Sequence, residues 1–138
     1  MLRWSLILGG LFNFVMGFVF FSNELMEQFF HIALRLETML FSQSGVLVMP
    51  QDELHLLLIH GFGAAAMILG ATLIYSARDA VRFLPFIFID GIGRFVFGTL
   101  MLVYVFRYQL PRVIVLFAFL ELAFAMFYIT ASLQKRKT

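Results

Sequence analysis

The stretch FIFIDGIGRFVFG, residues Phe86–Gly98, places one aspartate and one arginine inside a run of phenylalanine, isoleucine, valine and glycine. Asp90 and Arg94 are four residues apart, so on a helix they lie on one face and can form an ion pair. A charged side chain near the centre of a bilayer costs roughly 2.5–3.5 kcal/mol on insertion scales. The stretch therefore predicts a membrane helix whose aspartate makes its arginine tolerable, in a fold that keeps both away from lipid.

The composition of the whole chain indicates an integral membrane protein. Of its 138 residues, 62% are hydrophobic and 13% are charged, and the mean hydropathy is +0.97. Soluble domains carry roughly 25% charged residues, and a small soluble domain has too little interior to bury so many apolar side chains. The chain has no cysteine, which excludes disulfides and thiolate metal sites. We expect a single integral membrane domain over residues 1–138.

Four segments are apolar over the roughly 20 residues that a helix needs to cross a bilayer. They are Ser5–Phe21, Leu54–Ser76, Phe83–Phe106 and Val113–Leu133. The first follows a basic residue, as in a signal peptide, but no small-residue cleavage site comes after it, so we expect it to be retained. The links ARDAVR and RYQLPR are short, which predicts antiparallel hairpins. The predicted fold class is all-α, a four-helix transmembrane bundle with short hairpin turns.

The basic residues predict the orientation of this bundle. One side collects Arg3, Arg78, Arg82, Lys135, Arg136 and Lys137, whereas the other side has Arg35, Arg107 and Arg112. The positive-inside rule places the richer side, and with it both termini, in the cytoplasm. The C-terminal QKRKT is expected to act as a topology signal that also touches anionic lipid. Three charges are too few for a nucleic-acid site.

The first loop, about thirty residues long, is too long for a simple turn. Polar residues recur along this loop in steps of three and four, which mark one face of a helix. These are Glu24, Glu27, Gln28, His31, Arg35, Thr38 and Ser42. The residues of the other faces are mostly apolar, and Glu37 is the exception. We expect an amphipathic helix over residues 23–42, capped by Ser22 or Asn23, with Asp52 capping the second span. The helix either lies in the outer membrane surface or folds over the bundle as a lid.

Each predicted span carries at least one strongly polar residue. They are Asn13 on the first, His60 on the second, Asp90 and Arg94 on the third, and Glu121 on the fourth. At about 1.5 Å of rise per residue, the side chains from all four helices reach one zone slightly outside the midplane. Arginine has five donors in a fork, so Glu121 can pair with Arg94 on the side that Asp90 leaves free. We predict a polar cluster of these five residues in the interior of the bundle.

An internal similarity links the first and third spans. Residues 10–17 read GLFNFVMG and residues 91–98 read GIGRFVFG, so that Asn13 aligns with Arg94. The match indicates either a parallel duplication of a helical hairpin, with a site at the repeat interface, or the bias of this composition toward glycine, phenylalanine and valine. Glycines on the same faces let helix backbones approach closely in lipid.

Motifs for metal and haem are missing. His55 and His60 point to different sides of a helix and cannot share a ligand, and zinc needs three or four convergent ligands. No haem or metal is therefore predicted. The glycines of GFG and GIG are expected to serve packing, because no strand or phosphate-binding loop accompanies them.

Residues His60–Gly98 resemble the middle of the small four-helix membrane proteins grouped as DoxX-like and BphX-like. The shared features are a second helix rich in glycine and alanine, a short Arg-Asp turn and a Gly-Arg pair on the third helix. This resemblance implies a multi-pass protein of the bacterial inner membrane. Some members of those families resemble subunits of quinone-linked oxidoreductases, so a quinone is one candidate ligand.

Three functions fit these observations. The first is a non-catalytic accessory or scaffold subunit, whose polar cluster holds the bundle and whose partners are lipid, other membrane subunits or further copies of the chain. The second is binding or processing of a quinone- or lipid-like amphiphile in a pocket lined by His60, Arg94 and Glu121, where Glu121 and His60 would transfer protons and Arg94 would stabilise charge. The third is proton or ion passage. A central arginine argues against the passage of cations.

Overall fold

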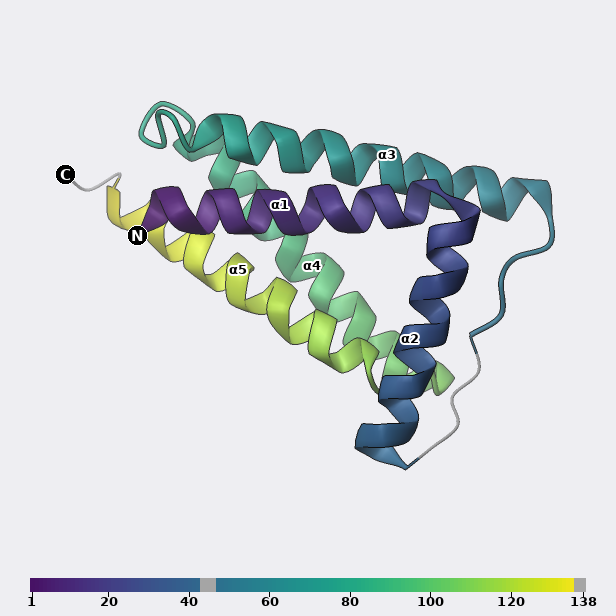
Figure 1. The fold of residues 1–138 in the computed structure, drawn as a ribbon. Helices are drawn as coiled ribbons and strands as arrows, with labels where there is room; N and C mark the ends of the chain where they lie inside the picture. Colours follow the sequence, from purple (N-terminus) through teal and green to yellow (C-terminus); the bar gives the residue numbers. More distant parts are fainter. Residues whose placement is uncertain (43–46, 136–138) are drawn as a thin grey trace.

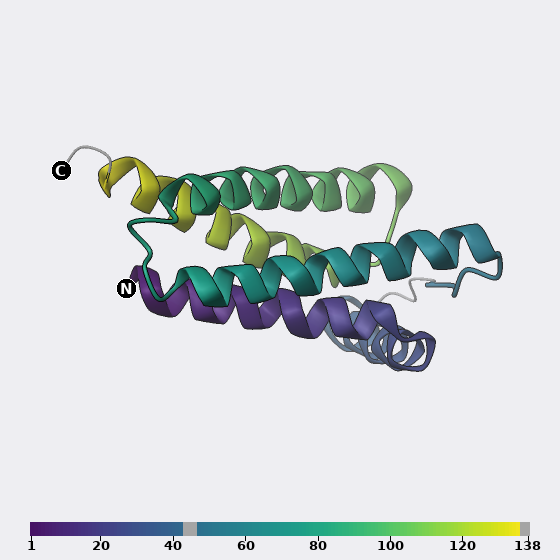
Figure 2. The same cartoon turned by 90° about the horizontal axis from the view of Figure 1, so that it is seen from above.

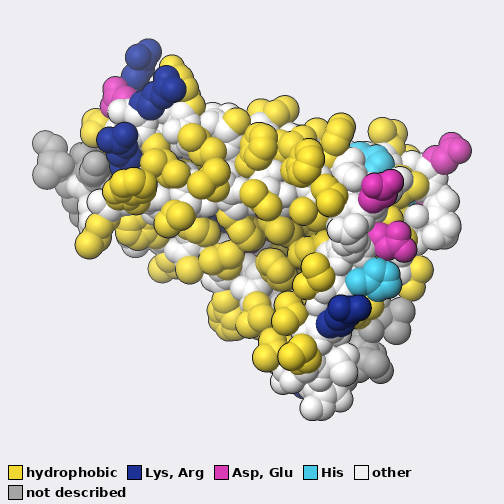
Figure 3. All heavy atoms as spheres, viewed as in Figure 1, with side chains coloured by type: hydrophobic (Ala, Val, Ile, Leu, Met, Phe, Trp, Pro, Cys, Tyr) yellow, Lys and Arg dark blue, Asp and Glu magenta, His cyan; other side chains and the backbone are white. Residues whose placement is uncertain are grey.

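The computed structural model describes residues 1–42 and 47–135 of the chain. Within these ranges the protein is all-α, as predicted, with five helices: α1 (Leu2–Phe21), α2 (Asn23–Phe41), α3 (Glu53–Ser76), α4 (Leu84–Tyr108) and α5 (Ile114–Lys135). The helices α1, α3, α4 and α5 are long and apolar enough to cross a membrane, which confirms the four predicted spans. Figure 3 shows hydrophobic side chains over the length of these helices, with charged side chains at the end that holds the termini and over α2.

The predicted caps are present at the helix ends. The Ser22 hydroxyl accepts a hydrogen bond from the backbone N–H of Leu25 at the start of α2, and Asp52 accepts one from the backbone N–H of His55 at the start of α3. The hydrogen bond from the backbone N–H of His55 lowers the pKa of Asp52, because it favours the ionised carboxylate. A carboxylate at this position also suits the positive end of the helix dipole.

The four spanning helices are arranged as two hairpins. One hairpin pairs α1 with α3 and the other pairs α4 with α5, whereas the principal contact between the hairpins is between α1 and α5. Figure 1 shows the two hairpins close together near the termini and diverging toward the other end, where α2 bridges the gap. The turn between α3 and α4 is short, as predicted, but these two helices do not pack along their lengths, and Figure 2 shows the space between them. The helices α3 and α4 run antiparallel, as predicted from the short turn, and their separation is a feature that the turn length did not predict.

Buried residues from all four spans meet at the end that holds the termini. Leu6 of α1, Leu73 of α3, Ile87 of α4 and Tyr128 of α5 are fully buried there and belong to one cluster. This cluster is the common core of the two hairpins. Beyond it the hairpins separate, and the space between them is not filled by a second core of this kind within the described residues.

Glycines bring the helices of each hairpin into close contact. A Cβ atom built on Gly10 would lie 2.6 Å from the carbonyl oxygen of Gly70, and one built on Gly17 would lie 2.5 Å from that of Gly63. In α4, the corresponding atoms on Gly91 and Gly98 would each lie 3.0 Å from a side chain of α5, Ile129 and Leu122 respectively. Gly10 and Gly17 of α1 align with Gly91 and Gly98 of α4. Each of these glycines faces the partner helix of its own hairpin. This supports the reading of the sequence similarity as a repeated helical hairpin.

The helix α2 has three faces. The predicted polar face is exposed, and a second face buries Met26, Ala33 and Glu37 against the hairpins. The third face is apolar and exposed, with Ile32, Leu36, Met39 and Leu40. The two alternatives for this helix are therefore compatible: one face covers the open end of the bundle, and a neighbouring apolar face is free to enter the membrane surface.

Glu37, the exception in the apolar part of this helix, has a defined role. Its side chain is buried, and its carboxylate accepts a hydrogen bond of 2.6 Å from the backbone N–H of Val113. Val113 directly precedes α5, where unpaired N–H groups and the positive end of the helix dipole favour an anion. Glu37 thereby fastens α2 to the start of α5.

The close contacts of Gly63 lead to a prediction about stability. We expect Gly63→Ala to lower the free energy of unfolding in detergent by about 1–3 kcal/mol, because the added methyl group would overlap the backbone of α1 and push the helices apart. Gly61→Ala is the matched control on the same helix, since a Cβ there meets nothing within 4 Å. Thermal unfolding followed by circular dichroism compares the two variants. Equal stability of both would contradict the proposed packing.

The bond from Glu37 predicts how firmly α2 is held. Glu37→Ala leaves the buried N–H of Val113 without a partner, which costs about 1–3 kcal/mol. We expect faster hydrogen–deuterium exchange in α2 and in the first turn of α5, with no change in α1. Glu27→Ala, on the exposed face of the same helix, is the control. Unchanged exchange in Glu37→Ala would mean that the other contacts of α2 are sufficient to hold it.

Candidate functional site

Arg94 is the centre of the polar cluster and contacts three helices. Its Nε donates to Asp90 Oδ2 at 2.8 Å on the same helix, and its Nη1 donates to Glu121 Oε2 at 2.7 Å on α5. Its Nη2 donates to the carbonyl oxygen of Gly9 on α1 at 3.2 Å. The guanidinium, Asp90 and Glu121 are all buried. Two ion pairs and a backbone acceptor therefore stabilise a charge that would be costly next to lipid.

Aromatic side chains complete the surroundings of Arg94. The guanidinium carbon lies 5.2 Å from the ring centre of Phe124 and 5.6 Å from that of Tyr128, distances at which a cation is attracted to the ring faces. The hydroxyl of Tyr128 donates to the carbonyl oxygen of Ser5 on α1 at 2.8 Å. A Cβ on Gly9 would overlap this hydroxyl. Arg94 and Tyr128 together form the polar connection between the two hairpins.

Four of the five predicted cluster residues lie around the space between the hairpins, and His60 does not. Asp90, Arg94 and Glu121 form the ion pairs, and Asn13 lines the same cavity as all three. His60 instead contacts Asn23 at the start of α2, with 2.9 Å between its Nε2 and the Oδ1 of Asn23. Counting residues along a helix gives the depth of a side chain but not its distance from another hairpin. Because the hairpins diverge, His60 is separated from Arg94.

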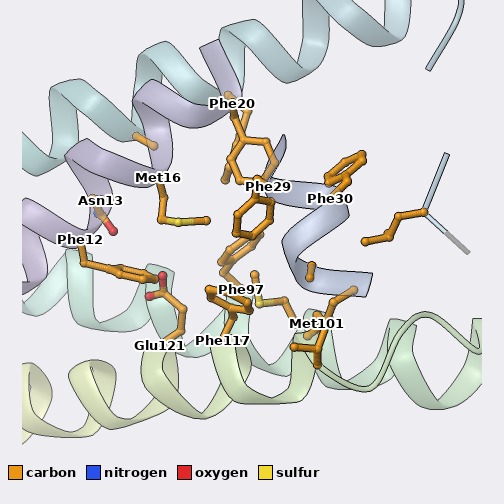
Figure 4. Close-up of a pocket in the computed structure, with 16 residues that line it drawn as sticks. Phe12, Asn13, Met16, Phe20, Phe29, Phe30, Phe97, Met101, Phe117 and Glu121 are labelled. Carbon is orange, nitrogen blue, oxygen red and sulfur yellow. The ribbon is translucent and has the colours of Figure 1, made fainter. Parts of the chain in front are cut away.

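A cavity of about 210 Å³ lies between the hairpins and beneath α2. Most of its lining is aromatic or aliphatic, and the phenylalanines and methionines that Figure 4 labels come from α1, α2, α4 and α5. Asn13 and Glu121 are the polar side chains on its border among the described residues. Phe29, Phe30 and Ala33 of α2 form part of the wall, so α2 closes this cavity at the end of the bundle that lies away from the termini.

A second cavity, of about 360 Å³, continues from the first toward the polar cluster. The two share Asn13, Phe62, Ala66, Phe97 and Glu121. The second also reaches Asp90 and Arg94, and most of its lining residues come from α3 and α4. Leu69, Ile89 and Gly93 on its border are exposed, so this cavity opens sideways within the spanning part of the protein.

Two polar groups of the lining have unused hydrogen-bonding capacity. Glu121 pairs with Arg94 through Oε2, and in the described part of the chain its Oε1 accepts no hydrogen bond. The Asn13 amide makes no side-chain hydrogen bond with the described residues either. An amide can donate and accept, whereas a carboxylate can only accept. Their position beside an apolar cavity suits the polar end of an amphiphile.

The groups that this arrangement offers to a ligand are the amide of Asn13 and the free carboxylate oxygen of Glu121. Over residues 1–42 and 47–135 there is no group of three histidine, aspartate or glutamate side chains placed to hold a metal ion. The carboxylates of Asp90 and Glu121 are both engaged by Arg94.

Sequence reasoning missed several residues of the site. Tyr128 of α5 and the two phenylalanines Phe29 and Phe30 of α2 are not among the predicted site residues. The position of Tyr128, seven residues after Glu121, was the available signal, because residues seven apart lie on nearly the same helix face. The role of Gly9 had no signal apart from its size.

Comparisons of the chain with protein-family models, with curated proteins and with solved structures found no match. The resemblance to DoxX-like and BphX-like proteins is therefore not confirmed. The functional interpretation rests on the geometry of the cluster and of the two cavities.

The ion pairs of Arg94 predict a specific pattern of stability changes. We expect Arg94→Leu to lower the free energy of unfolding by about 3–5 kcal/mol, because two buried carboxylates lose their partner. The triple variant Asp90→Asn/Arg94→Leu/Glu121→Gln should recover most of this loss, since it leaves no unpaired charge. Unfolding in detergent measures both.

Arg107→Leu is the control for this comparison, since Arg107 is an exposed arginine at the end of the same helix. It should unfold at nearly the same temperature as the parent protein. A triple variant no more stable than Arg94→Leu would show that the cost does not arise from unpaired charge.

Proposed function

We propose that the protein binds a small single-chain amphiphile, taken from the membrane, in the space between its two hairpins. The apolar part of the ligand lies among the phenylalanine side chains, and its polar end lies at Asn13 and Glu121. The observation that carries this proposal is an apolar cavity at membrane depth whose border has two polar groups with unused hydrogen-bonding capacity.

The size and the opening of the site support this proposal. An apolar cavity of about 150 Å³ is large enough to hold benzene, and the cavity beneath α2 has a volume of about 210 Å³. The lining of the second cavity includes exposed residues of α3 and α4, namely Leu69, Ile89 and Gly93. A ligand dissolved in the bilayer could therefore enter sideways without crossing water.

A structural role of the cluster does not account for this space. The contacts of Arg94 support the hypothesis that the cluster holds the bundle together, as an accessory or scaffold subunit would require. However, an unfilled apolar cavity lowers stability by about 24 cal/mol per Å³, so a purely structural bundle would be more stable with larger side chains there. We therefore favour ligand binding over a purely structural scaffold role as the function of the protein.

Proton or ion passage receives less support from the geometry. A path through the predicted polar cluster would include His60, but His60 lines neither cavity and lies beside Asn23. The guanidinium also occupies the centre of the path and opposes the passage of cations.

We also propose that the protein resides in the inner membrane of a bacterium with both termini in the cytoplasm. Arg3, Arg78 and Arg82 are exposed at the end that holds the termini, as the positive-inside rule requires of a cytoplasmic surface. The exposed polar face of α2 then lies on the opposite side of the membrane.

A variant that fills the cavity tests binding separately from folding. Ala66 borders both cavities, and Ala66→Phe should occupy the shared space. We expect labelling of the protein in nanodiscs by a diazirine derivative of dodecanol to fall by about tenfold at subsaturating concentration. Mass spectrometry of the labelled peptides identifies the residues that are reached.

The matched control is Ala71→Phe, an identical substitution at an exposed position of the same helix that borders neither cavity. It should be labelled like the parent protein. Circular dichroism verifies that both variants are folded. Equal labelling of the parent protein and of Ala66→Phe would overturn the proposed function.

A further inference from the structure

We infer that the polar end of the ligand is a positively charged hydrogen-bond donor, of the kind provided by a long-chain primary amine. This inference rests on the proposed function and specifies the chemistry of its ligand. It follows from the balance of charge in the cluster, from the free acceptor on Glu121 and from the aromatic lining of the cavity.

The cluster has an excess of negative charge. Asp90 and Glu121 supply two carboxylates and Arg94 supplies one guanidinium, so that the ionised cluster has one negative charge more than it has positive charges. Among the described residues that border the cavities, Arg94 is the sole cation. In a region of low dielectric an uncompensated charge is costly. A cationic ligand would neutralise the excess.

The acceptor that would receive this cation is already in place. Arg94 engages Oε2 of Glu121 and leaves Oε1 without a donor in the described part of the chain. Glu121 borders both cavities, as does Asn13, whose amide oxygen is a second acceptor. An ammonium group has three donors and no acceptor, so it can donate a hydrogen bond to each of these two oxygens.

The surrounding rings favour the same ligand class. The rings of Phe12, Phe97 and Phe117 line the same cavity as Glu121, from α1, α4 and α5 (Figure 4). The faces of aromatic rings attract cations, and aromatic cages are a recurrent means of binding ammonium groups. The same rings contact an alkyl chain well, so the polar end and the apolar chain of an amine both find suitable surfaces.

An anionic head group is disfavoured at this site. It would lie next to two carboxylates, and like charges in a desolvated site repel strongly. The guanidinium compensates only in part, because its single positive charge is already shared between the carboxylates of Asp90 and Glu121. A phospholipid with an amine head group also carries a phosphate, so we commit to an amine without one.

Competition between probes of equal chain length tests the inference. The parent protein in zwitterionic nanodiscs is labelled with the diazirine derivative of dodecanol in the presence of dodecylamine, dodecanol, dodecanoate or the lauroyl lysophosphatidylethanolamine. Each competitor is expressed as a mole fraction in the membrane. We expect dodecylamine to compete about tenfold more effectively than dodecanol, and the two phosphate- or carboxylate-bearing probes not to compete.

Asp90→Asn removes one negative charge and keeps the pair between Arg94 and Glu121. In this variant the advantage of dodecylamine over dodecanol should shrink severalfold. If Asp90→Asn does not fold, the comparison of the four probes on the parent protein still decides the question. Labelling of Ala66→Phe gives the background from sites outside the cavity.

The possible failures are distinguishable. If no probe reduces the labelling, or if labelling does not depend on the cavity, the proposed function itself is wrong. If dodecanol competes but dodecylamine has no advantage, or if dodecanoate or the lysophospholipid competes as well as dodecylamine, the site binds amphiphiles and only the amine assignment is overturned. An unchanged advantage of dodecylamine in Asp90→Asn would also overturn it.

Discussion

The guanidinium of Arg94 needs acceptors within the protein, because the surrounding hydrocarbon offers it no water. Its three acceptors lie on α4, α5 and α1, so the requirement of a single side chain joins the two hairpins. The guanidinium carbon lies over the rings of Phe124 and Tyr128, and the Tyr128 hydroxyl adds a hydrogen bond to α1. The position of α1 relative to α4 and α5 depends on this set of contacts together with the buried cluster near the termini.

The remaining architecture follows from how unevenly the helices pack. Glycines allow backbone contact between α1 and α3, and close packing of small residues is what associates helices in lipid. Between the hairpins the contacts are concentrated at the terminal end and the cluster, and the hairpins diverge beyond them (Figure 1). A ring contact between Phe62 of α3 and Phe97 of α4 still spans the gap there. The cavity is the consequence of this divergence. Helix α2 covers it at one end, where the buried carboxylate of Glu37 binds the start of α5.

Much of this could be predicted from local patterns. The four spans, the helix caps at Ser22 and Asp52 and the polar face of α2 depend on hydropathy, spacing and side-chain chemistry, all of which are present in a short window of sequence. The pair of Asp90 with Arg94 lies within one helical turn. The pair with Glu121 was predictable because a buried arginine needs acceptors and the fourth span offers one carboxylate. The glycines of the two similar segments predicted close packing but not which helices they contact.

The sequence by itself determined that this chain is a multi-pass α-helical membrane protein with a charged group that must be shielded from lipid, because hydropathy and the cost of a buried charge are properties of single segments. Only the tertiary structure decided which helices pair, that α3 and α4 separate after a short turn, that His60 stays outside the cluster and that Glu37 is buried. These depend on rotations and crossing angles of whole helices, which are set by contacts between distant segments. The space between the hairpins, and with it the candidate binding site, exists only through those angles.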